Sequence, residues 1–386
     1  MLVACVTLLL GVTACSSEEF GMEVPEASRM IETRANEPLP VYMRTFKKDV
    51  RIRCLATENV IIHWGGEGTT KIVAGDYSEH RHTFSTEEPY NINIEASKDA
   101  IIQLEVSNND LTHLNVENNI NLEILGCNNN GLPALNLTGC PNLKIINAMS
   151  NKLSNIDLTQ LHDLEELRIN SNKFTQSIDL SQNLKLHTLQ LEHSNISSLD
   201  ISKNTQLQYL YVGGNSITSL DLTNNTDLRA VNLYDLPIYT INNKRICETS
   251  FSSLTQLERL NIHNTPFYAL DLSKNNKIHE LFISETDIDY LDLTGVFINY
   301  FYANDSKLNT LVCTPECLSD CAFFAIYNTP FEERDSTYLI DFIANNIPDR
   351  FDPLKDGTIV TGIIMTNSSA IKSTQGRLDL LNWIVL

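Results

Sequence analysis

Positive charge is scarce in this sequence. The 386 residues include 28 Lys and Arg against 48 Asp and Glu, which gives a formal net charge of −20. Proteins bind nucleic acids largely through Lys and Arg contacts to phosphates, and no basic stripe offsets the acidic balance locally. We therefore expect no nucleic-acid partner, and the charge favours a basic or neutral ligand.

Long apolar runs and catalytic motifs are also lacking. Beyond the first 14 residues, no stretch approaches the ~20 apolar residues that a transmembrane helix needs. The sequence contains no G-x-S-x-G, no H-E-x-x-H and no Gly-rich phosphate-binding loop. We therefore predict a protein that binds rather than catalyses, and we expect no cofactor.

The first residues predict export. An uncharged run from Leu2 to Ala14 has the length of a signal-peptide core and is too short to span a bilayer. It ends in V-T-A-C at residues 12–15, which resembles the processing box of bacterial lipoproteins, and S-S-E-E follows at residues 16–19. The resemblance implies a signal peptide over residues 1–14, acylation of Cys15, and an acidic tether over residues 15–40. It also implies display at the outer membrane surface.

Residues 41–100 contain short β-rich runs separated by turn residues. The segment from His63 to Thr69, H-W-G-G-E-G-T, resembles the D-W-G-D-G-T hairpin of PKD-like β-sandwich domains. Both aspartates of that pattern are missing, because His63 and Gly66 stand in their places, so an ion site is not implied. We expect a small β-sandwich that covers the N-terminal edge of the next region.

From Ile101 the chain is periodic, with a repeat of about 21 residues. Each turn reads LxxLxLxxNxLxxLDLxxNxx, and its two L-x-L segments alternate as strands with one buried face do. Neither segment can bury its leucines alone, so the turns must stack into one continuous core. After Ile101, the motif begins again at Leu122, Leu143, Leu164, Leu186, Leu207, Leu228, Leu257, Ile278 and Ile298.

These repeats resemble bacterial leucine-rich repeats of the internalin and BspA-like kind, and most closely the 21-residue class called IRREKO repeats. The resemblance covers residues 101–313 and implies a mainly β solenoid of about ten turns. Residues 314–386 resemble the enlarged final turn of such proteins and are expected to form a C-terminal α/β cap, with helical spacing at Tyr338–Ala344 and a strand at Thr358–Ile364.

An asparagine follows the first L-x-L segment of many turns. Its amide can donate to and accept from backbone groups at the bend of the coil, so we predict a structural role rather than a binding one. From Leu228 onward other residues take this position: Leu236, Thr265, Thr286 and Ser306. The corner asparagines are Asn109, Asn130, Asn151, Asn172 and Asn215.

The outward residue of the L-D-L segment is nearly constant from turn to turn. Uniformity indicates a shared packing role, in which the carboxylates accept hydrogen bonds from nearby hydroxyls and backbone amides. A calcium-bridged row of carboxylates is the alternative. The aspartates concerned are Asp157, Asp179, Asp200, Asp221, Asp271 and Asp292.

The outward residues of the L-x-x-L-x-L segment vary instead, and they include aromatic residues and arginines, which carry much of the binding energy at interfaces. We predict that this side binds the ligand, with ordinary surface variation as the alternative. Protein and glycan ligands are both compatible with it. The predicted binding residues are Arg168, Tyr209, Tyr211, Tyr234, Arg259, His263, Phe282, Tyr300 and Tyr302.

Three cysteines, Cys313, Cys317 and Cys321, lie close together where the repeat fades. A disulfide between two of them is the first expectation for an exported protein, followed by buried free thiols. A zinc site comes last, because no fourth ligand is evident.

The sequence as a whole favours recognition or adhesion at the cell surface, with a protein ligand bound by the variable side of the solenoid. A carbohydrate-capture lipoprotein that serves nutrient uptake is the first alternative. A passive structural component of the envelope is the second.

Overall fold

The computed structural model describes residues 41–330, with gaps at residues 87, 243, 246–250 and 319, together with residues 362–365 and 383–385. The predicted signal peptide, the tether and Cys15 lie outside these residues, and so does the predicted helix at 338–344. In the described part of the chain, no helix is long and apolar enough to cross a bilayer.

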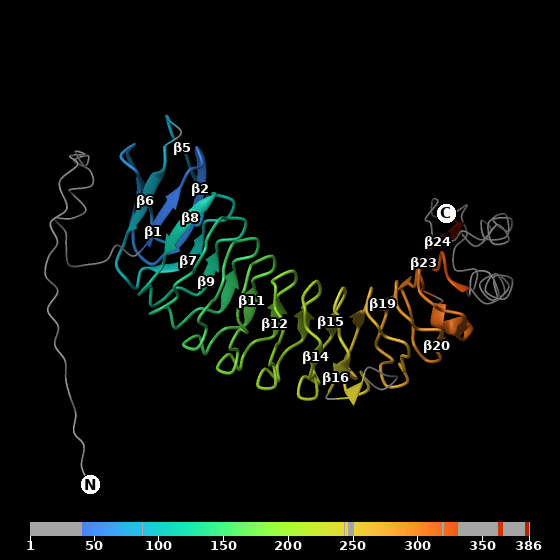
Figure 1. The fold of residues 1–386 in the computed structure, drawn as a ribbon. Coiled ribbons are helices and arrows are strands. Elements are labelled where there is room, and N and C mark those ends of the chain that lie inside the picture. Colours follow the sequence, from blue (N-terminus) through green and yellow to red (C-terminus); the bar gives the residue numbers. More distant parts are fainter. Residues whose placement is uncertain are drawn as a thin grey trace, which may run out of the picture. The chain divides into compact units, whose positions relative to one another are not determined.

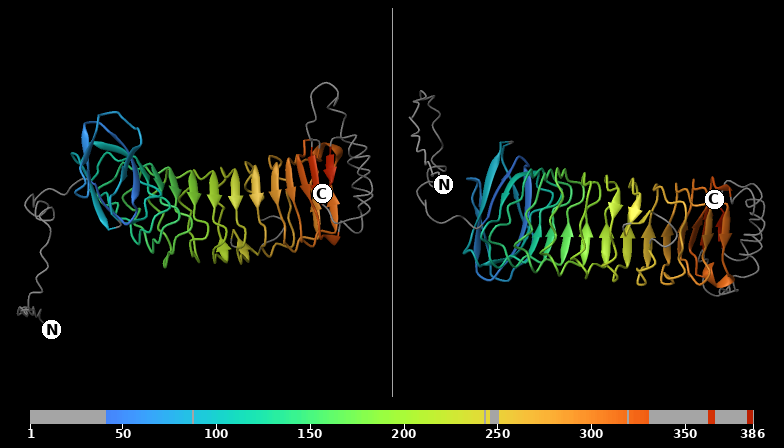
Figure 2. Two further views of the ribbon diagram at one scale, coloured as in Figure 1. Left: turned by 90° about the horizontal axis from the view of Figure 1, so that it is seen from above. Right: turned by 60° about the horizontal axis from the view of Figure 1, so that its bottom comes forward.

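A single sheet of 15 strands runs along the repeats (Figures 1 and 2). From β7 to β25 its neighbouring strands are parallel, one strand for each turn of the coil. Its order is β5 (His80–Thr83), β2 (Asp49–Ala56), β7 (Ile101–Glu105), β9 (Ile124–Gly126), β10 (Ile145–Asn147), β11 (Glu166–Arg168), β12 (Thr188–Gln190), β13 (Tyr209–Tyr211), β15 (Ala230–Asn232), β18 (Arg259–Asn261), β19 (Glu280–Phe282), β21 (Tyr300–Tyr302), β23 (Phe323–Ala325), β24 (Gly362–Met365) and β25 (Trp383–Val385).

The leucine lattice lies in one shared interior, as the repeat predicts. Leu167, Leu189 and Leu210 pair in register on adjacent strands, and each is fully buried. Full burial of such a side chain contributes about 2 kcal/mol. Because every turn adds several of these residues, the stacked core supplies the stability that no single turn could.

The opposite side of the coil carries few strands. Only a few turns form a strand ladder there, and some backbone amides bond to side chains instead; Thr159 N–H, for example, donates to Asp157 Oδ1 at 3.0 Å. The prediction of a strand on both sides of every turn is therefore only partly right. The strands present are β8 (Leu111–Asn115) of the first turn, then β14 (Ser219–Leu220), β16 (Thr240–Ile241) and β17 (Lys244–Arg245) in one sheet, and β20 (Tyr290–Asp292) and β22 (Thr310–Val312) in another.

The corner asparagines join adjacent turns, which confirms their predicted role. Asn151 Nδ2 donates to Ala148 O of its own turn at 3.1 Å and to Cys127 O of the preceding turn at 3.0 Å. Its Oδ1 accepts from Leu132 N–H at 3.1 Å. One amide thus satisfies three backbone groups that the bend leaves unpaired.

A second asparagine ladder follows the L-D-L segment, and the sequence interpretation did not assign it. Asn204 Nδ2 donates to Leu180 O at 3.1 Å and to Asn183 O at 2.9 Å, both in the preceding turn. Asn225 and Asn275 make the equivalent pairs of bonds. The L-D-L side is therefore held by side-chain amides where it lacks a strand ladder.

The disulfide expectation for Cys313, Cys317 and Cys321 is wrong, because all three are free and buried. Cys317 occupies the position of the second asparagine ladder, and its thiol donates to Leu293 O at 2.9 Å, 24 residues back, as Asn275 does to Phe251 O. Burial raises the pKa of Cys313 and of Cys321 to about 12. These thiols are packing groups, which agrees with the second expectation.

The N-terminal strands form two sheets that continue into the first turn of the solenoid. One sheet has the order β4 (Thr69–Ile72), β3 (Val60–Trp64), β6 (Tyr90–Glu95), β1 (Val41–Thr45) and β8 (Leu111–Asn115). In the other, β2 pairs with β7 of the solenoid. The predicted hairpin is confirmed, with His63 opposite Thr69. Since β7 and β8 are both paired on this side, the edge of the solenoid is covered as expected.

The ladder continues beyond the last recognisable repeat. A 3-10 helix, η1 (Pro315–Leu318), follows the tenth turn, and β23 then pairs with β21 in the same register as the repeats. Strand β24 overlaps the strand predicted at 358–364. The motif fades near residue 313, whereas the strand stacking does not.

Candidate functional site

We define the strand face as the outward side of strands β7–β23 together with the two residues that follow each strand. Strand pairing places Arg168, Gln190, Tyr211 and Asn232 in one row across four turns, and Phe282 pairs with Tyr302 in the same row farther along. All nine predicted binding residues lie on this face. Seven of them fall into three groups that sequence spacing alone did not separate, and the other two, Arg259 and His263, pair with acidic residues.

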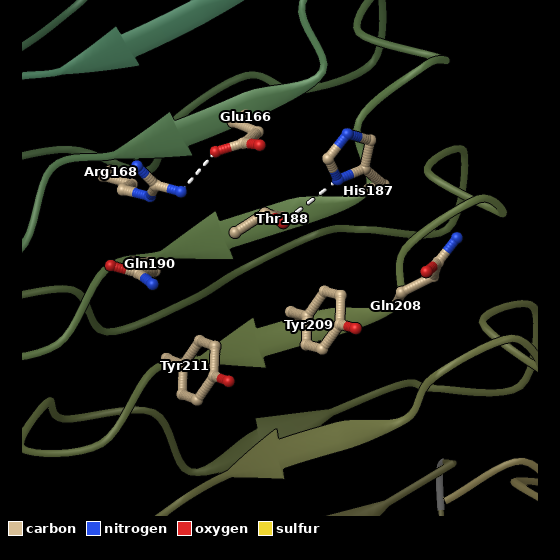
Figure 3. Close-up of a pocket in the computed structure, with 8 residues that line it drawn as sticks. All are labelled: Glu166, Arg168, His187, Thr188, Gln190, Gln208, Tyr209 and Tyr211. Carbon is tan, nitrogen blue, oxygen red and sulfur yellow. Dashed lines mark hydrogen bonds and ion pairs between the residues drawn. The ribbon is translucent and has the colours of Figure 1, made fainter.

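The first group surrounds a shallow pocket of about 430 Å³ on strands β11, β12 and β13 (Figure 3). Its middle strand carries Thr188, which is buried and short, between longer side chains on the two neighbouring strands. The pocket exists because of this difference in side-chain length. It is lined by Glu166, Arg168, His187, Thr188, Gln190, Gln208, Tyr209 and Tyr211.

The pocket is polar and carries little net charge. Arg168 pairs with Glu166 on its own strand, and His187 Nδ1 lies 3.0 Å from Thr188 Oγ1. Tyr209 and Tyr211 lie side by side along β13 with their hydroxyls directed the same way (Figure 3). Among the described residues, neither ring stacks on another aromatic ring, so their faces can contact a ligand.

The second group spans two glycines. Tyr234 Oη lies 2.8 Å from His193 Nε2, although the two residues belong to turns on either side of Gly213 and Gly214. A Cβ at Gly213 would lie 2.4 Å from the Tyr234 ring, and one at Gly214 would lie 2.2 Å from the His193 ring. The contact of Tyr234 with His193 across the intervening turn therefore requires glycine at both positions.

Glu192 also makes a contact across the turn that carries Gly213 and Gly214. Its carboxylate accepts from Asn170 Nδ2 at 2.7 Å and from Asn232 Nδ2 at 3.1 Å, two turns farther along the chain. Burial raises the pKa of Glu192 above its ordinary value. The sequence interpretation missed Glu192 and His193; the signal was the pair Gly213-Gly214, which removes two successive outward side chains from one turn.

The third group is a stack of aromatic rings. The Phe282 and Tyr302 ring centroids are 4.8 Å apart, and those of Tyr302 and Phe323 are 4.7 Å apart, each pair nearly parallel. The rings thus cover one another's faces and present mainly their edges. Tyr300, beside them on β21, is 42% exposed. Phe323 was not predicted, because it lies beyond the last recognisable repeat.

The cationic predicted residues have acidic partners. Arg259 Nη2 donates to Glu280 Oε1 at 2.7 Å, and on its other side Arg259 pairs with the small, buried Ala230. His263 Nε2 lies 3.8 Å from Glu285 Oε1. These ion pairs hold the side chains of the face in place and leave little net charge on it.

The constant aspartates on the other side of the coil have the packing role that was predicted. Each Oδ1 accepts a hydrogen bond from the backbone amide two residues on, at 2.8–3.0 Å, and so forms an Asx turn. In the described part of the chain, no group of His, Cys, Asp or Glu is arranged to hold a metal ion. The pairs are Asp157–Thr159, Asp179–Ser181, Asp200–Ser202, Asp221–Thr223, Asp271–Ser273 and Asp292–Thr294.

No protein-family model matches the chain, and no curated protein matches it. Among solved structures, it is similar to the functional domain of InlJ from Listeria monocytogenes, with 25% identity over 59% of this chain and 58% of that one and a TM-score of 0.42. An internalin from the same organism matches with 22% identity over 59% of this chain and 74% of that one, and a TM-score of 0.47.

The leucine-rich effector protein YopM from Yersinia pestis matches with 16% identity over 59% of this chain and 72% of that one, and a TM-score of 0.43. The match to the InlJ domain spans little more than half of that protein's length. The assignment of this chain as a leucine-rich-repeat solenoid rests on its own strand register and buried lattice.

Proposed function

We propose that this chain recognises a partner protein at a bacterial cell surface through the strand face. One observation carries the proposal: outward residues on the strand face differ from turn to turn, whereas those on the other side repeat and are used in Asx turns. A coil that only had to stack would need no such difference between its sides. Tyrosine and arginine are concentrated on the varied side, and these residues supply hot spots at protein interfaces.

The form of the face suits a macromolecular ligand. Its pocket is shallow, and three groups of residues are spread along strands β11–β23. Contacts distributed over so many turns match the extended surfaces by which solenoids bind their partners.

The test uses surface-protein arrays probed with the wild-type chain and with a variant carrying alanine at Tyr209, Tyr211, Tyr300 and Tyr302. We expect the variant to lose at least about 100-fold in affinity for the wild-type partner, since hot-spot residues cost about 2 kcal/mol or more each. A matched control replaces three exposed tyrosines on the other side of the coil, Tyr239, Tyr268 and Tyr290, and should bind normally. Equal binding by all three proteins would contradict the strand-face site, and no partner for any of them would favour a passive envelope component.

Carbohydrate capture is the second candidate, and the pocket is the observation that favours it. Amide groups, a neutralised ion pair and two tyrosines with free faces can contact the hydroxyls and the apolar face of a sugar. A glycan array distinguishes the candidates, because selective glycan binding that disappears in Tyr209→Ala, with no protein partner found, would favour the sugar.

We further propose that Cys15 carries a lipid that holds the chain at the outer membrane surface. The support is the sequence at residues 12–19. In cells, Cys15→Ala should move the protein from the membrane fraction to the soluble fraction, while a neighbouring Ser16→Ala change should not. Membrane association that survives Cys15→Ala would refute the anchor.

A further inference from the structure

Glu192 differs in its partners from Glu166 and Glu280 of the strand face. Glu166 pairs with Arg168, Glu280 pairs with Arg259, and other glutamates at the edge of the face pair with lysine or arginine in the same way. Glu192 is held by the neutral amides of Asn170 and Asn232 and forms no ion pair with Lys or Arg in the described part of the chain. No Lys or Arg of the described residues therefore compensates its negative charge, and His193, the next residue, is the titratable neighbour that favours the ionised form.

The position of Glu192 makes this charge costly. The side chain is half-buried, and burial raises the pKa of its carboxyl group, which shows that the surroundings disfavour the charged form. A partly desolvated carboxylate is stabilised best by a cation that also hydrogen-bonds to it. A ligand that brings such a cation would gain that stabilisation on binding.

Two tyrosines border the carboxylate. Asn232, whose side chain bonds the carboxylate, pairs with Tyr211 on the neighbouring strand, and Tyr234 follows Asn232 by two residues on the same face. Gly213 allows this arrangement, because the Tyr234 ring occupies the space that a side chain at residue 213 would fill. A carboxylate bordered by aromatic rings suits an ammonium or guanidinium group, which interacts with the charge and the rings together.

We propose that Glu192, Tyr211 and Tyr234 form a subsite for one lysine or arginine side chain of a protein ligand. The proposal rests on the proposed function and specifies the chemistry of the partner. Tyr211 also lines the pocket on β11–β13, so a residue next to that lysine or arginine would enter the pocket. The net charge of −20 adds a long-range attraction for a basic segment.

The experiment screens a library of random 12-residue peptides against the full chain and measures the affinity of the best binders. We expect lysine or arginine to be enriched at one position of the bound peptides. Glu192→Gln keeps the size of the side chain and should weaken the best peptide at least about tenfold, which corresponds to losing one charged hydrogen bond. Asp200→Asn removes the same charge from the other side of the coil and should change affinity less than twofold.

Tyr211→Leu provides a second variant that leaves the carboxylate in place, and it should also weaken the peptide several-fold. Thermal melting of each variant shows that it is folded. Bound peptides without basic enrichment, or equal losses in Glu192→Gln and Asp200→Asn, would overturn the subsite and leave protein recognition standing. Binding of glycans and of no peptide would overturn the proposed function as well.

Discussion

Two regions of the solenoid connect their turns by different means. In the turns that begin at residues 122, 143 and 164, corner asparagines bond to their own turn and to the preceding one, so that Cys127 O accepts from both Asn130 and Asn151. In the turns that begin at residues 257, 278 and 298, the corner residue is Thr or Ser. The Thr286 hydroxyl donates only to Ile283 O, three residues back in its own turn.

Aromatic rings connect neighbouring turns where the corner asparagines are absent. Phe251 stacks on Phe267 with centroids 5.6 Å apart, and Phe301 packs against Phe324 at 5.0 Å. These contacts join adjacent turns through the core, as the Phe282–Tyr302 stack does on the strand face. Hydrogen bonds at the corner and apolar contacts between rings are therefore alternative means of connecting one turn to the next. Different substitutions should weaken each of them.

The largest expected effect comes from removing a ring. Phe301→Ala should lower the free energy of opening its turn by about 4 kcal/mol, because it leaves a large cavity and removes the contact with Phe324. Hydrogen exchange on residues 278–325 measures this energy. Phe301→Leu keeps most of the buried volume and should cost about 1.5 kcal/mol. Both variants lose the ring contact, so a negligible cost for Phe301→Leu would show that this contact contributes nothing beyond burial.

Removing a corner amide should cost somewhat less. Asn172→Ala removes three hydrogen bonds and should cost about 3 kcal/mol by the same measurement. Leu153 N–H loses its acceptor, whereas Ala148 O and Ile169 O keep Asn151 and Ser194 as donors. The matched change Thr286→Ala loses one bond within its turn and should cost about 1 kcal/mol. If the two changes cost the same, the corner amides do not couple the turns.

Adding a corner amide should stabilise the coil, whereas removing one destabilises it. Thr286→Asn is close to neutral in volume, and the new side chain could donate to Ile262 O and accept from Phe267 N–H, the groups equivalent to those that Asn172 uses. We expect this change to stabilise the C-terminal turns by about 0.5–1 kcal/mol. Slower hydrogen exchange at residues 257–298 is the readout, whereas faster exchange there would indicate that the ring-stacked turns cannot accept the ladder.

Acid should act on the Asx turns. Hydrogen bonds from Ser181 lower the pKa of Asp179 below its ordinary value of 3.8. The stability that the ionised carboxylate contributes is therefore complete above pH 3.8 and is lost as pH falls through the lowered pKa. The melting temperature should therefore fall only under strongly acidic conditions. Asp179→Asn keeps an oxygen acceptor for the turn and should reduce this dependence slightly; an unchanged acid profile would argue against the assignment.

Ionisation of Glu192 should have the smallest effect on stability, and its pH dependence should be opposite to that of Asp179. Since its pKa in the folded chain is raised above the ordinary 4.5, ionisation weakens the fold as pH rises from 4.5 through the raised value. Glu192→Gln should consequently give a slightly higher melting temperature at pH 7 and little change at pH 4. A lower melting temperature at pH 7 would mean that the carboxylate is already well stabilised without a ligand.

The sequence predicted those features that recur with the repeat. The inward leucines, the corner asparagines and the row of aspartates return about every 21 residues, and each occurrence supports the others. The second asparagine also recurs in the repeat pattern, but Asn183 and Asn204 stand beside other polar residues, and no role was assigned to this position. Cys317 was missed for a different reason. Its thiol replaces the asparagine amide as the donor to a carbonyl group of the preceding turn, and the sequence does not show which carbonyl group a side chain bonds.

The grouping of the strand-face residues could not be predicted in the same way. The pocket depends on Thr188 being shorter than its neighbours in space, and the crossing of Glu192 depends on an absent side chain at Gly213. Both are relations between residues 20 to 40 positions apart that no local pattern records. The sequence thus located the face, whereas the side-chain packing determines which of its residues can act together.

The link from Glu192 to Asn232 limits how this solenoid can change in length. Elsewhere, losing or duplicating one whole repeat would shorten or extend the coil and leave each surviving turn with an equivalent neighbour. Between residues 192 and 232 the same event would remove the glycine-bearing turn or insert a turn with full side chains, and the two ends of the link could no longer meet. Gain and loss of repeats should therefore be tolerated toward either end of the coil and excluded around residues 207–227.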